Sequence, residues 1–255
     1  MLPKISVITP SFNQAPFLEE TLLSVVRQEY PNLEFIVIDG GSSDCSVDLI
    51  RKYENKIDYW VSEPDGGHTF GLVKGFARAT GEILCWLNSD DVFEPGALLE
   101  VGQYFAAHPE EQAVYGDALW IDIHGRVIRS KKEHSFSRFI WMYDYNYIPQ
   151  PSTFWKREIY DAVGGLDTSF RLAFDADLWI RFADVASLRH VPRVWSRMRL
   201  YREQRNQKFR EISNREDEAM RRRYCGQESM VSRKAKNVIA KALRVAWKAT
   251  TGCYW

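Results

Sequence analysis

The sequence lacks long apolar runs, paired cysteines and metal-binding histidine motifs. No stretch of about 18 apolar residues occurs, so no membrane-spanning helix is predicted. The apolar residues Ile5 to Thr9 form too short a run for a signal peptide and are typical of a first strand. The four cysteines include no Cys-x-x-Cys pair and the five histidines no His-Glu-x-x-His, which excludes the usual zinc sites and disulfide frameworks. With no Asn-x-Ser/Thr acceptor either, these absences favour a reducing, cytoplasmic setting.

The charge is balanced overall but divided unevenly along the chain. The 255 residues hold 34 Lys or Arg and 34 Asp or Glu, and 45% are hydrophobic, as in an ordinary globular protein. From Arg193 onward, however, 17 basic residues stand against 6 acidic ones, and residues 1–192 carry the opposite excess. This division predicts that the C-terminal part either meets an anionic partner or folds back on its own acidic domain.

The order of apolar segments predicts an α/β fold. Buried strands are expected at residues 4–9, 33–38, 57–61 and 83–87, and helices between them at 17–28, from Asp44 and at 69–79. Strands that alternate with helices favour a mostly parallel sheet flanked by helices on both faces.

The second half of the chain is less regular. It predicts a helix beyond Pro95, strands at 113–115, 119–123 and 127–128, an irregular aromatic stretch at 135–155, and helices at 156–163 and from Asp175. After residue 205 the pattern is helical and strongly charged. We therefore predict a catalytic domain over residues 1–204 and a basic helical extension over residues 205–255.

Polar residues follow three of the expected strands. They are Thr9-Pro10-Ser11, Asp39-Gly40-Gly41 and Asn88-Ser89-Asp90-Asp91. Ligands of parallel sheets bind beyond the carboxyl ends of the strands, so these segments predict the ligand cleft.

Asp90 and Asp91 are the most informative of these residues. Adjacent carboxylates repel each other unless they are solvated, hydrogen-bonded or neutralised by a cation. Hard divalent ions such as magnesium and manganese are typically held by one or two carboxylates and substrate phosphates. The alternative is that the two aspartates cap the helix that follows Pro95.

Three further acidic motifs have two interpretations each. Glu63-Pro64-Asp65-Gly66-Gly67 is either a tight turn or a place where backbone approaches a ligand. Asp39 is either part of an ordinary loop or an acceptor for a base or ribose. In Asp175-x-Asp177 either carboxylate is a helix cap or a general base, and Asp177 is the better candidate for the structural role.

Taken together, these motifs resemble the inverting family-2 glycosyltransferases of bacterial polysaccharide assembly, which have the GT-A fold. The resemblance covers about residues 4–205. The matching stretches are short, but their order and spacing are specific: residues 6–13, 39–44, 63–67, 81–91, 150–154, 164–167 and 174–179.

The resemblance implies a nucleoside-diphosphate sugar as donor and a saccharide acceptor, either free or lipid-linked. Thr9, Pro10 and Ser11 would line the nucleotide pocket. Asp39 would read the base, and Asp65 would lie near the ribose or the donor sugar.

The resemblance also assigns the chemistry. Asp90 would face the sugar or ribose, and Asp91 would bind the divalent metal, Mn²⁺ or Mg²⁺, that bridges the donor diphosphate. Asp175 matches the family's catalytic base. The metal would stabilise the leaving group, while the base removes the proton of the attacking hydroxyl.

The sequence departs from the family at three places. Phe174 stands where a Glu often precedes the base, Val73-Lys74-Gly75 replaces Asn-Lys-Gly, and Tyr201 stands where relatives often have His. These changes concern the contacts with the acceptor and the strength of metal binding.

The basic extension predicts an amphipathic helix. Its apolar positions and Trp247, Tyr254 and Trp255 are typical of a helix that lies on an anionic membrane face. The alternative is a helix packed on the catalytic domain or on a dimer partner. No nucleic-acid motif accompanies the charge, so nucleic acid is not predicted as a partner.

Two other functions are compatible with the same scaffold. A metal-dependent nucleotidyltransferase usually has a Gly-rich basic loop after its first strand, and residues 10–14 do not supply one. A catalytically silent binding protein would not need Asp39, Asp91 and Asp175 together.

Overall fold

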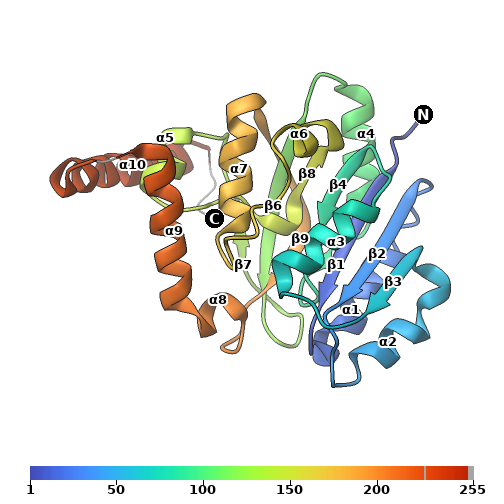
Figure 1. The fold of residues 1–255 in the computed structure, drawn as a ribbon. Helices are drawn as coiled ribbons and strands as arrows, with labels where there is room; N and C mark the ends of the chain where they lie inside the picture. The colour runs from blue at the N-terminus through green and yellow to red at the C-terminus, as the bar shows by residue number, and fades with distance from the viewer. Residues whose placement is uncertain (227, 252–255) are drawn as a thin grey trace.

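The computed structural model describes residues 1–226 and 228–251 (Figure 1). The strands are β1 (Ile5–Ser11), β2 (Leu33–Asp39), β3 (Tyr59–Ser62), β4 (Ile83–Trp86), β5 (Val92–Phe93), β6 (Ala113–Ile121), β7 (Val127–Lys131), β8 (Thr153–Lys156) and β9 (Leu188–Arg199). The helices are α1 (Ala15–Val26), α2 (Ser46–Lys52), α3 (His68–Arg78), α4 (Ala97–Ala107), α5 (Arg138–Tyr143), α6 (Arg157–Ala162), α7 (Phe174–Val185), α8 (Arg205–Lys208), α9 (Arg210–Cys225) and α10 (Met230–Thr251). Two short 3₁₀ turns, η1 (Glu54–Lys56) and η2 (Gln150–Ser152), complete the described structure.

The strands form one sheet in the order β3-β2-β1-β4-β8-β6-β9-β5, with β7 paired to β6. The first four strands in this order are parallel, as the alternation of strands and helices predicts. The second half is mixed: β8 is antiparallel to β4 and β6, whereas β9 is parallel to β6 and antiparallel to β5. The α/β fold is therefore confirmed, and its parallel character is concentrated in the N-terminal half.

The differences from expectation lie in the second half. The two strands expected at 113–115 and 119–123 are one strand, β6, and the aromatic stretch 135–155 contains α5 and β8. The long strand β9 was not predicted, because Pro192 and several charges interrupt its apolar pattern. At Gly116 the β9 backbone comes so close that an added Cβ would lie 2.6 Å from the carbonyl oxygen of Arg193.

An aromatic core lies beneath the start of α7. The indoles of Trp86 and Trp179 stack with centroids 5.6 Å apart, and Trp155 meets both rings edge-on. The Phe174 ring lies 6.0 Å from that of Trp86. Because these large side chains are buried, they fix the first turn of α7 against the carboxyl end of β4.

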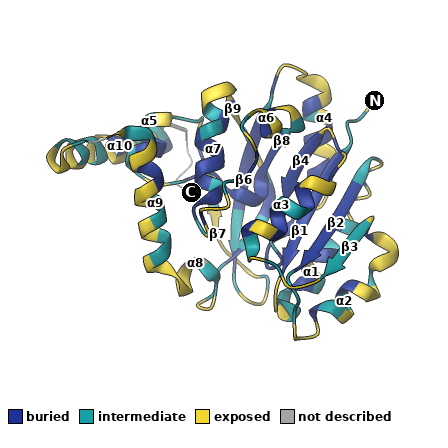
Figure 2. Cartoon of the chain, viewed as in Figure 1, coloured by how far each residue is buried: buried dark blue, intermediate teal, exposed yellow. Residues whose placement is uncertain are grey.

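The C-terminal helices follow the sheet. Helix α9 contacts α7, and α10 packs on α5 with one face while it projects from the body of the protein (Figure 1). The other face of α10 is exposed (Figure 2). Within the described residues, no helix is long and apolar enough to cross a membrane. Cys253, Tyr254 and Trp255 lie outside the described residues.

Candidate active site

The register of the parallel strands brings the predicted loops to one edge of the sheet. Ser11 at the end of β1 pairs with Asp39 at the end of β2, and Asp39 pairs with Ser62 at the end of β3. On the other side of β1, Ile8 pairs with Trp86, so the loop that carries Asp90 and Asp91 starts at the same edge. The hydroxyls of Thr9 and Ser11 are buried and have no hydrogen-bond partner among the described residues.

Asp65 lies between the loop after β2 and helix α3. A Cβ atom added to Gly40 would lie 3.2 Å from one Asp65 carboxylate oxygen, and one added to Gly71 would lie 3.1 Å from the other. The Gly67 N–H donates to the same carboxylate at 2.7 Å. Two glycines thus leave room for the Asp65 carboxylate beside the Asp39 loop, where the sequence predicts the nucleotide pocket.

Asp39 is fully buried and already holds four hydrogen bonds. It accepts from the backbone N–H groups of Gly41 and Ser42 and from the hydroxyls of Ser42 and Ser62, at 2.5 to 3.1 Å. This carboxylate therefore shapes the loop after β2. Its predicted contact with a base remains a prediction.

Asp90 and Asp91 are buried beside each other between β4 and β5. Asp90 accepts a hydrogen bond from the Tyr201 hydroxyl at 2.9 Å, and Asp91 accepts one from the Arg199 backbone N–H at 2.9 Å. Burial raises the pKa of Asp90, and burial together with the Asp90 charge raises the pKa of Asp91 well above its usual value. Across the described ranges, neither carboxylate has an ion-pair partner.

Arg199 and Tyr201 bring the end of β9 to this carboxylate pair. The Arg199 guanidinium donates to the Asp90 carbonyl at 2.9 Å and to Glu20 at 2.5 Å. Phe17 packs against both, 4.7 Å from the guanidinium and 4.9 Å from the Tyr201 ring. Sequence reasoning noted position 201 only as a departure from the family and gave Arg199 no role. Arg199 is the last residue of β9, a strand that the sequence did not predict, and Tyr201 follows two residues later.

Asp175 is the second residue of α7. One of its carboxylate oxygens accepts from the Ala176 N–H at 2.7 Å, and the other accepts from the Asn146 side chain at 3.1 Å. Burial raises its pKa from 3.8 to about 6, and the charge of Asp217 adds to the rise. A carboxyl with this pKa is largely ionised at neutral pH and still basic enough to accept a proton.

A series of contacts links Asp175 to Asp91. The Asn88 amide lies 3.3 Å from an Asp91 carboxylate oxygen and donates to Gln150 at 2.9 Å. The His68 side chain hydrogen-bonds that of Asn88, and its ring lies 5.5 Å from the ring of Phe174, the residue directly before Asp175. Burial, followed by the charge of Arg205, lowers the pKa of His68 to about 3, so the imidazole is neutral.

Asp177 has a different environment from Asp175. It is fully buried, accepts from the Arg181 guanidinium at 2.7 Å and accepts from the Tyr224 hydroxyl at 2.8 Å. These bonds tie α7 to itself and to α9, which fits the structural role expected for Asp177. It is not a helix cap, because the residue before α7 is Ala173 and no side chain caps the helix locally.

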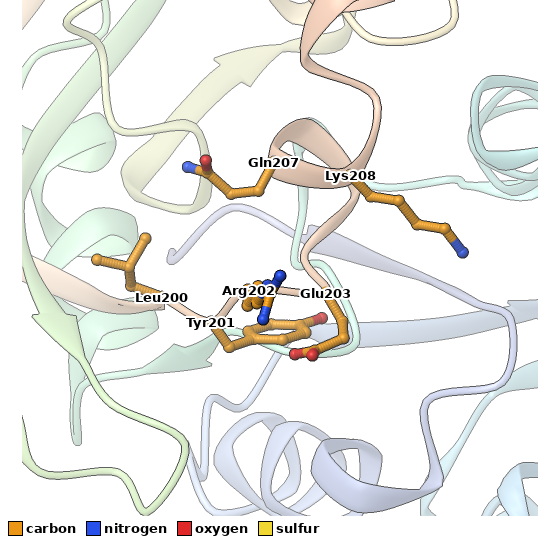
Figure 3. A pocket seen from close by; sticks show the side chains of 6 residues that line it. All are labelled: Leu200, Tyr201, Arg202, Glu203, Gln207 and Lys208. Atoms are coloured by element: carbon orange, nitrogen blue, oxygen red, sulfur yellow. The ribbon is translucent and has the colours of Figure 1, made fainter.

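An open cavity of about 800 Å³ lies beside Tyr201 (Figure 3). It is lined by residues 200–203, 207 and 208, and Figure 3 shows Gln207 and Lys208 across from Tyr201 and Glu203. Arg205 follows in the same segment; burial and the charge of Arg171 lower its pKa, while Glu216 and Asp65 act in the opposite direction. Along the described chain, no carboxylate forms an ion pair with Arg202, Arg205 or Lys208.

The sequence profile described as glycosyl transferase family 2 matches residues 6–166, well over half of the chain. The chain belongs to this family. An uncharacterized glycosyltransferase of Mycobacterium tuberculosis is 31% identical over 183 residues, which cover 71% of this chain and 69% of the relative. TuaG of Bacillus subtilis is 36% identical over 100 residues, which cover 38% of this chain and 39% of the relative. Its name assigns it provisionally to teichuronic acid biosynthesis.

Two solved structures illustrate the similarity of fold. Staphylococcus aureus TarS 1–349 in complex with UDP-GlcNAc has a TM-score of 0.67 at 16% identity, over 92% of this chain and 70% of that one. The mannosyltransferase PcManGT from Pyrobaculum calidifontis, in complex with GDP-Man and Mn²⁺, has a TM-score of 0.67 at 19% identity, over 100% and 76%.

These comparisons confirm the family and the GT-A-like fold expected from the sequence. The protein is a family-2 glycosyltransferase. The family match ends at residue 166, before Asp175, and within the described residues no three His, Cys, Asp or Glu side chains form a cluster that could hold a metal by themselves.

Proposed function

We propose that this glycosyltransferase transfers a sugar from a nucleoside-diphosphate donor to an acceptor hydroxyl in one displacement that inverts the anomeric carbon. The observation that carries the proposal is that the Asp90–Asp91 pair and Asp175 have different environments, although contacts through Asn88, His68 and Phe174 connect them. Asp90 and Asp91 are adjacent and buried and form no ion pair with a described residue, and burial raises the pKa of both despite the nearby charge of Arg199. Asp175 stands apart as a carboxyl with a pKa of about 6. A donor site and a base are the two parts that such a displacement requires.

In this proposal Asp91 binds a divalent metal, Mn²⁺ or Mg²⁺. The side chains fit such an ion because two adjacent buried carboxylates supply hard oxygen donors and excess negative charge. Donor phosphate oxygens would complete the coordination, as such ions usually require. When bound, the ion supplies Lewis-acid stabilisation of the departing diphosphate.

The donor nucleotide occupies the edge formed by β1, β2 and β3. Thr9, Pro10 and Ser11 line the pocket, where the two partnerless hydroxyls have the hydrogen-bonding capacity to meet a base or ribose. Asp65 lies beside the ribose or the sugar, and Asp39 holds the loop that meets the base. Asp90 faces the sugar or ribose, with its orientation set by Tyr201.

The segment 200–208 supplies positive charge to the diphosphate. Arg202 and Lys208 line the cavity of Figure 3, and Arg205 lies between them in the chain. None of the three forms an ion pair with a described residue. Burial and the charge of Arg171 lower the pKa of Arg205 despite the charges of Glu216 and Asp65, so a further anion beside it would stabilise its charged form. A diphosphate is the anion that the neighbouring donor site would provide.

Asp175 is the base that removes the proton from the acceptor hydroxyl. Its two hydrogen bonds, from Ala176 and Asn146, orient the carboxylate and leave lone pairs for that proton. The neutral His68 ring and Phe174 pack beside it and limit the access of water.

The decisive experiment measures thermal stabilisation by a panel of UDP-, GDP- and dTDP-sugars, with and without Mn²⁺ or Mg²⁺. A ligand that binds the native state raises the melting temperature by mass action. We expect one nucleotide class to stabilise the wild type only with metal, and Asp91→Ala to lose both that stabilisation and sugar transfer. Asp48→Ala, which removes an exposed carboxylate from α2, is the matched control. Normal metal-dependent binding and turnover by Asp91→Ala would show that the metal site is misassigned.

We further propose that α10 attaches the enzyme to an anionic membrane surface. A polysaccharide acceptor on a lipid carrier would be available at such a surface. The name of the relative TuaG supports a role in surface polysaccharide assembly. Val231, Val238 and Val245 stand seven residues apart on one face of α10 and are 79%, 66% and 47% exposed. Ile239 and Leu243 widen this apolar face, and the 22 residues of α10 include no acid. A broad apolar face on a purely basic helix is typical of interfacial helices.

Vesicle sedimentation tests the attachment. We expect the wild type to bind vesicles that contain phosphatidylglycerol and not pure phosphatidylcholine, and Val238→Asp/Ile239→Asp to bind neither. Val185→Asp, which alters an exposed apolar residue at the end of α7, is the control that should bind as the wild type does. A concentration-dependent dimer that dissociates in the double variant, without vesicle binding by the wild type, would instead assign this face to a second copy of the chain.

A further inference from the structure

Glu216 on α9 occupies the N-terminal end of the helix that carries Asp175. Its carboxylate accepts hydrogen bonds from three successive backbone N–H groups: those of Arg171 at 3.0 Å, Leu172 at 2.7 Å and Ala173 at 3.1 Å. These residues lie 43 to 45 positions before Glu216 in the chain. A side chain from another helix thus holds the backbone of the three residues directly before the first turn of α7.

Helix α7 has no local alternative to this contact. Ala173 at its N-cap position cannot accept a hydrogen bond with its side chain. The N-terminal end of a helix carries a partial positive charge, so the Glu216 carboxylate bonded to the residues directly before α7 is favourably placed. In α7 that first turn contains Asp175.

Helix α9 also holds the other neighbour of Asp175. The Arg221 guanidinium donates to the carbonyl oxygens of Trp141 and Met142 at the end of α5, and Asp217 orients that guanidinium at 2.8 Å. The segment that follows α5 carries Asn146, which donates to Asp175. Both donors to the Asp175 carboxylate, Ala176 on α7 and Asn146 after α5, therefore belong to segments that α9 contacts.

We propose that Glu216 is a positioning residue for the base, which places the extension after residue 204 within the catalytic machinery. The inference rests on the proposed role of Asp175 and adds to it. Glu216 does not touch the substrate. It holds the 171–173 backbone so that the Asp175 carboxylate stays between Ala176 and Asn146.

The experiment compares Glu216→Ala, Glu216→Gln and Glu218→Gln in the full chain. Glu218 lies on the same helix, is about half exposed and pairs with Arg222, so it is the matched control. We expect Glu216→Ala to lower kcat about 10- to 100-fold because the base is displaced, whereas any change in donor affinity that comes from losing the Glu216 charge near Arg205 should be equal in Glu216→Gln. Glu216→Gln should lose less, since an amide oxygen still accepts N–H bonds. Glu218→Gln should match the wild type.

Two further readouts separate positioning from general destabilisation. Amide exchange of residues 171–173, followed by mass spectrometry, should accelerate in both Glu216 variants and stay unchanged in Glu218→Gln. The acid limb of kcat/KM should move below the wild-type limb near pH 6, because a loosened first turn exposes Asp175 to water and so reduces the burial that raises its pKa. The neighbouring Asp217 and Asn146 stay in place.

The outcomes distinguish the inference from the proposed function. If Asp175→Asn remains active, the proposed base is wrong whatever Glu216 does. If Asp175 is essential but the Glu216 variants keep the wild-type kcat and amide protection, the positioning role is overturned. It is also overturned if their loss of activity follows the melting temperature alone and the acid limb does not move.

Discussion

Replacing Asp175 by Asn should make the protein more stable and nearly inactive. In the native state burial raises the pKa of this carboxyl from 3.8 to about 6. The native state therefore binds the proton more tightly than the unfolded chain, and ionisation costs stability as the pH rises from about 4 to about 6. Above that range the cost is constant at about 3 kcal/mol, from a shift of about two pKa units. Because Asp175 keeps some accessible surface, this figure is an upper bound.

The variant removes the ionisation cost but also one hydrogen bond. The amide oxygen introduced by Asp175→Asn can still accept from the Ala176 N–H, while the amide nitrogen would face the Asn146 donor, for a loss of about 1 kcal/mol. We expect a net gain of about 2 kcal/mol at pH 8 and none at pH 4, where the wild-type carboxyl is protonated in the native state. Turnover should fall about 10²- to 10⁴-fold with donor affinity unchanged.

Urea unfolding at pH 4 and pH 8, together with turnover and calorimetric donor binding, tests this expectation. Asp184→Asn is the control, since Asp184 lies on the same helix and its carboxylate is 47% exposed in a pair with Arg138. It should show neither the pH-dependent gain nor the loss of turnover. An Asp175→Asn variant that is no more stable at pH 8 than at pH 4, relative to wild type, would refute the burial argument. One that turns over normally would refute the catalytic assignment.

Two other substitutions test the neighbouring contacts. Asp177→Asn should lower the free energy of unfolding by about 3–5 kcal/mol, because the buried Arg181 guanidinium loses its counter-charge, and the folded fraction should keep most of its turnover. Urea unfolding and activity at low temperature measure both, and an inactive but fully stable variant would mean that Asp177 is the base. Tyr201→Phe removes the donor to Asp90 and should weaken metal-dependent donor binding by about 10-fold, since hydrogen bonds to charged groups contribute about 1.5–3 kcal/mol. Calorimetry with unchanged affinity would show that Tyr201 does not orient Asp90.

The N-terminal half of the fold was predictable because its strands are short, apolar and separated by helices. Each strand end carries its own polar loop, so the position of Asp39, Asp65 and Asp91 at one edge follows from the parallel topology alone. Asp175 was identified by family resemblance, since a carboxylate in the first turn of a helix has the same local pattern as a helix cap.

The contacts of Arg199 and Glu216 could not be predicted in the same way. Arg199 reaches Asp91 across 108 positions, and Glu216 reaches Ala173 across 43. In both cases one partner is a backbone N–H, which is present at every residue except proline and leaves no mark on the sequence. Only the packing of β9 and α9 selects which N–H is used.

The place of β9 in the sheet has a consequence for synthesis on the ribosome. Strand β5 begins directly after Asp91, but its pairing partner in the described structure is β9. When Asp91 leaves the ribosome, the parallel strands β1, β2, β3 and β4 are already complete, whereas Arg199 and Tyr201 are not yet made. N-terminal segments generally fold first during synthesis. The nascent chain therefore acquires the sheet edge formed by β1, β2 and β3 early, and the Asp90–Asp91 pair becomes fixed only after β9 has been inserted beside β6.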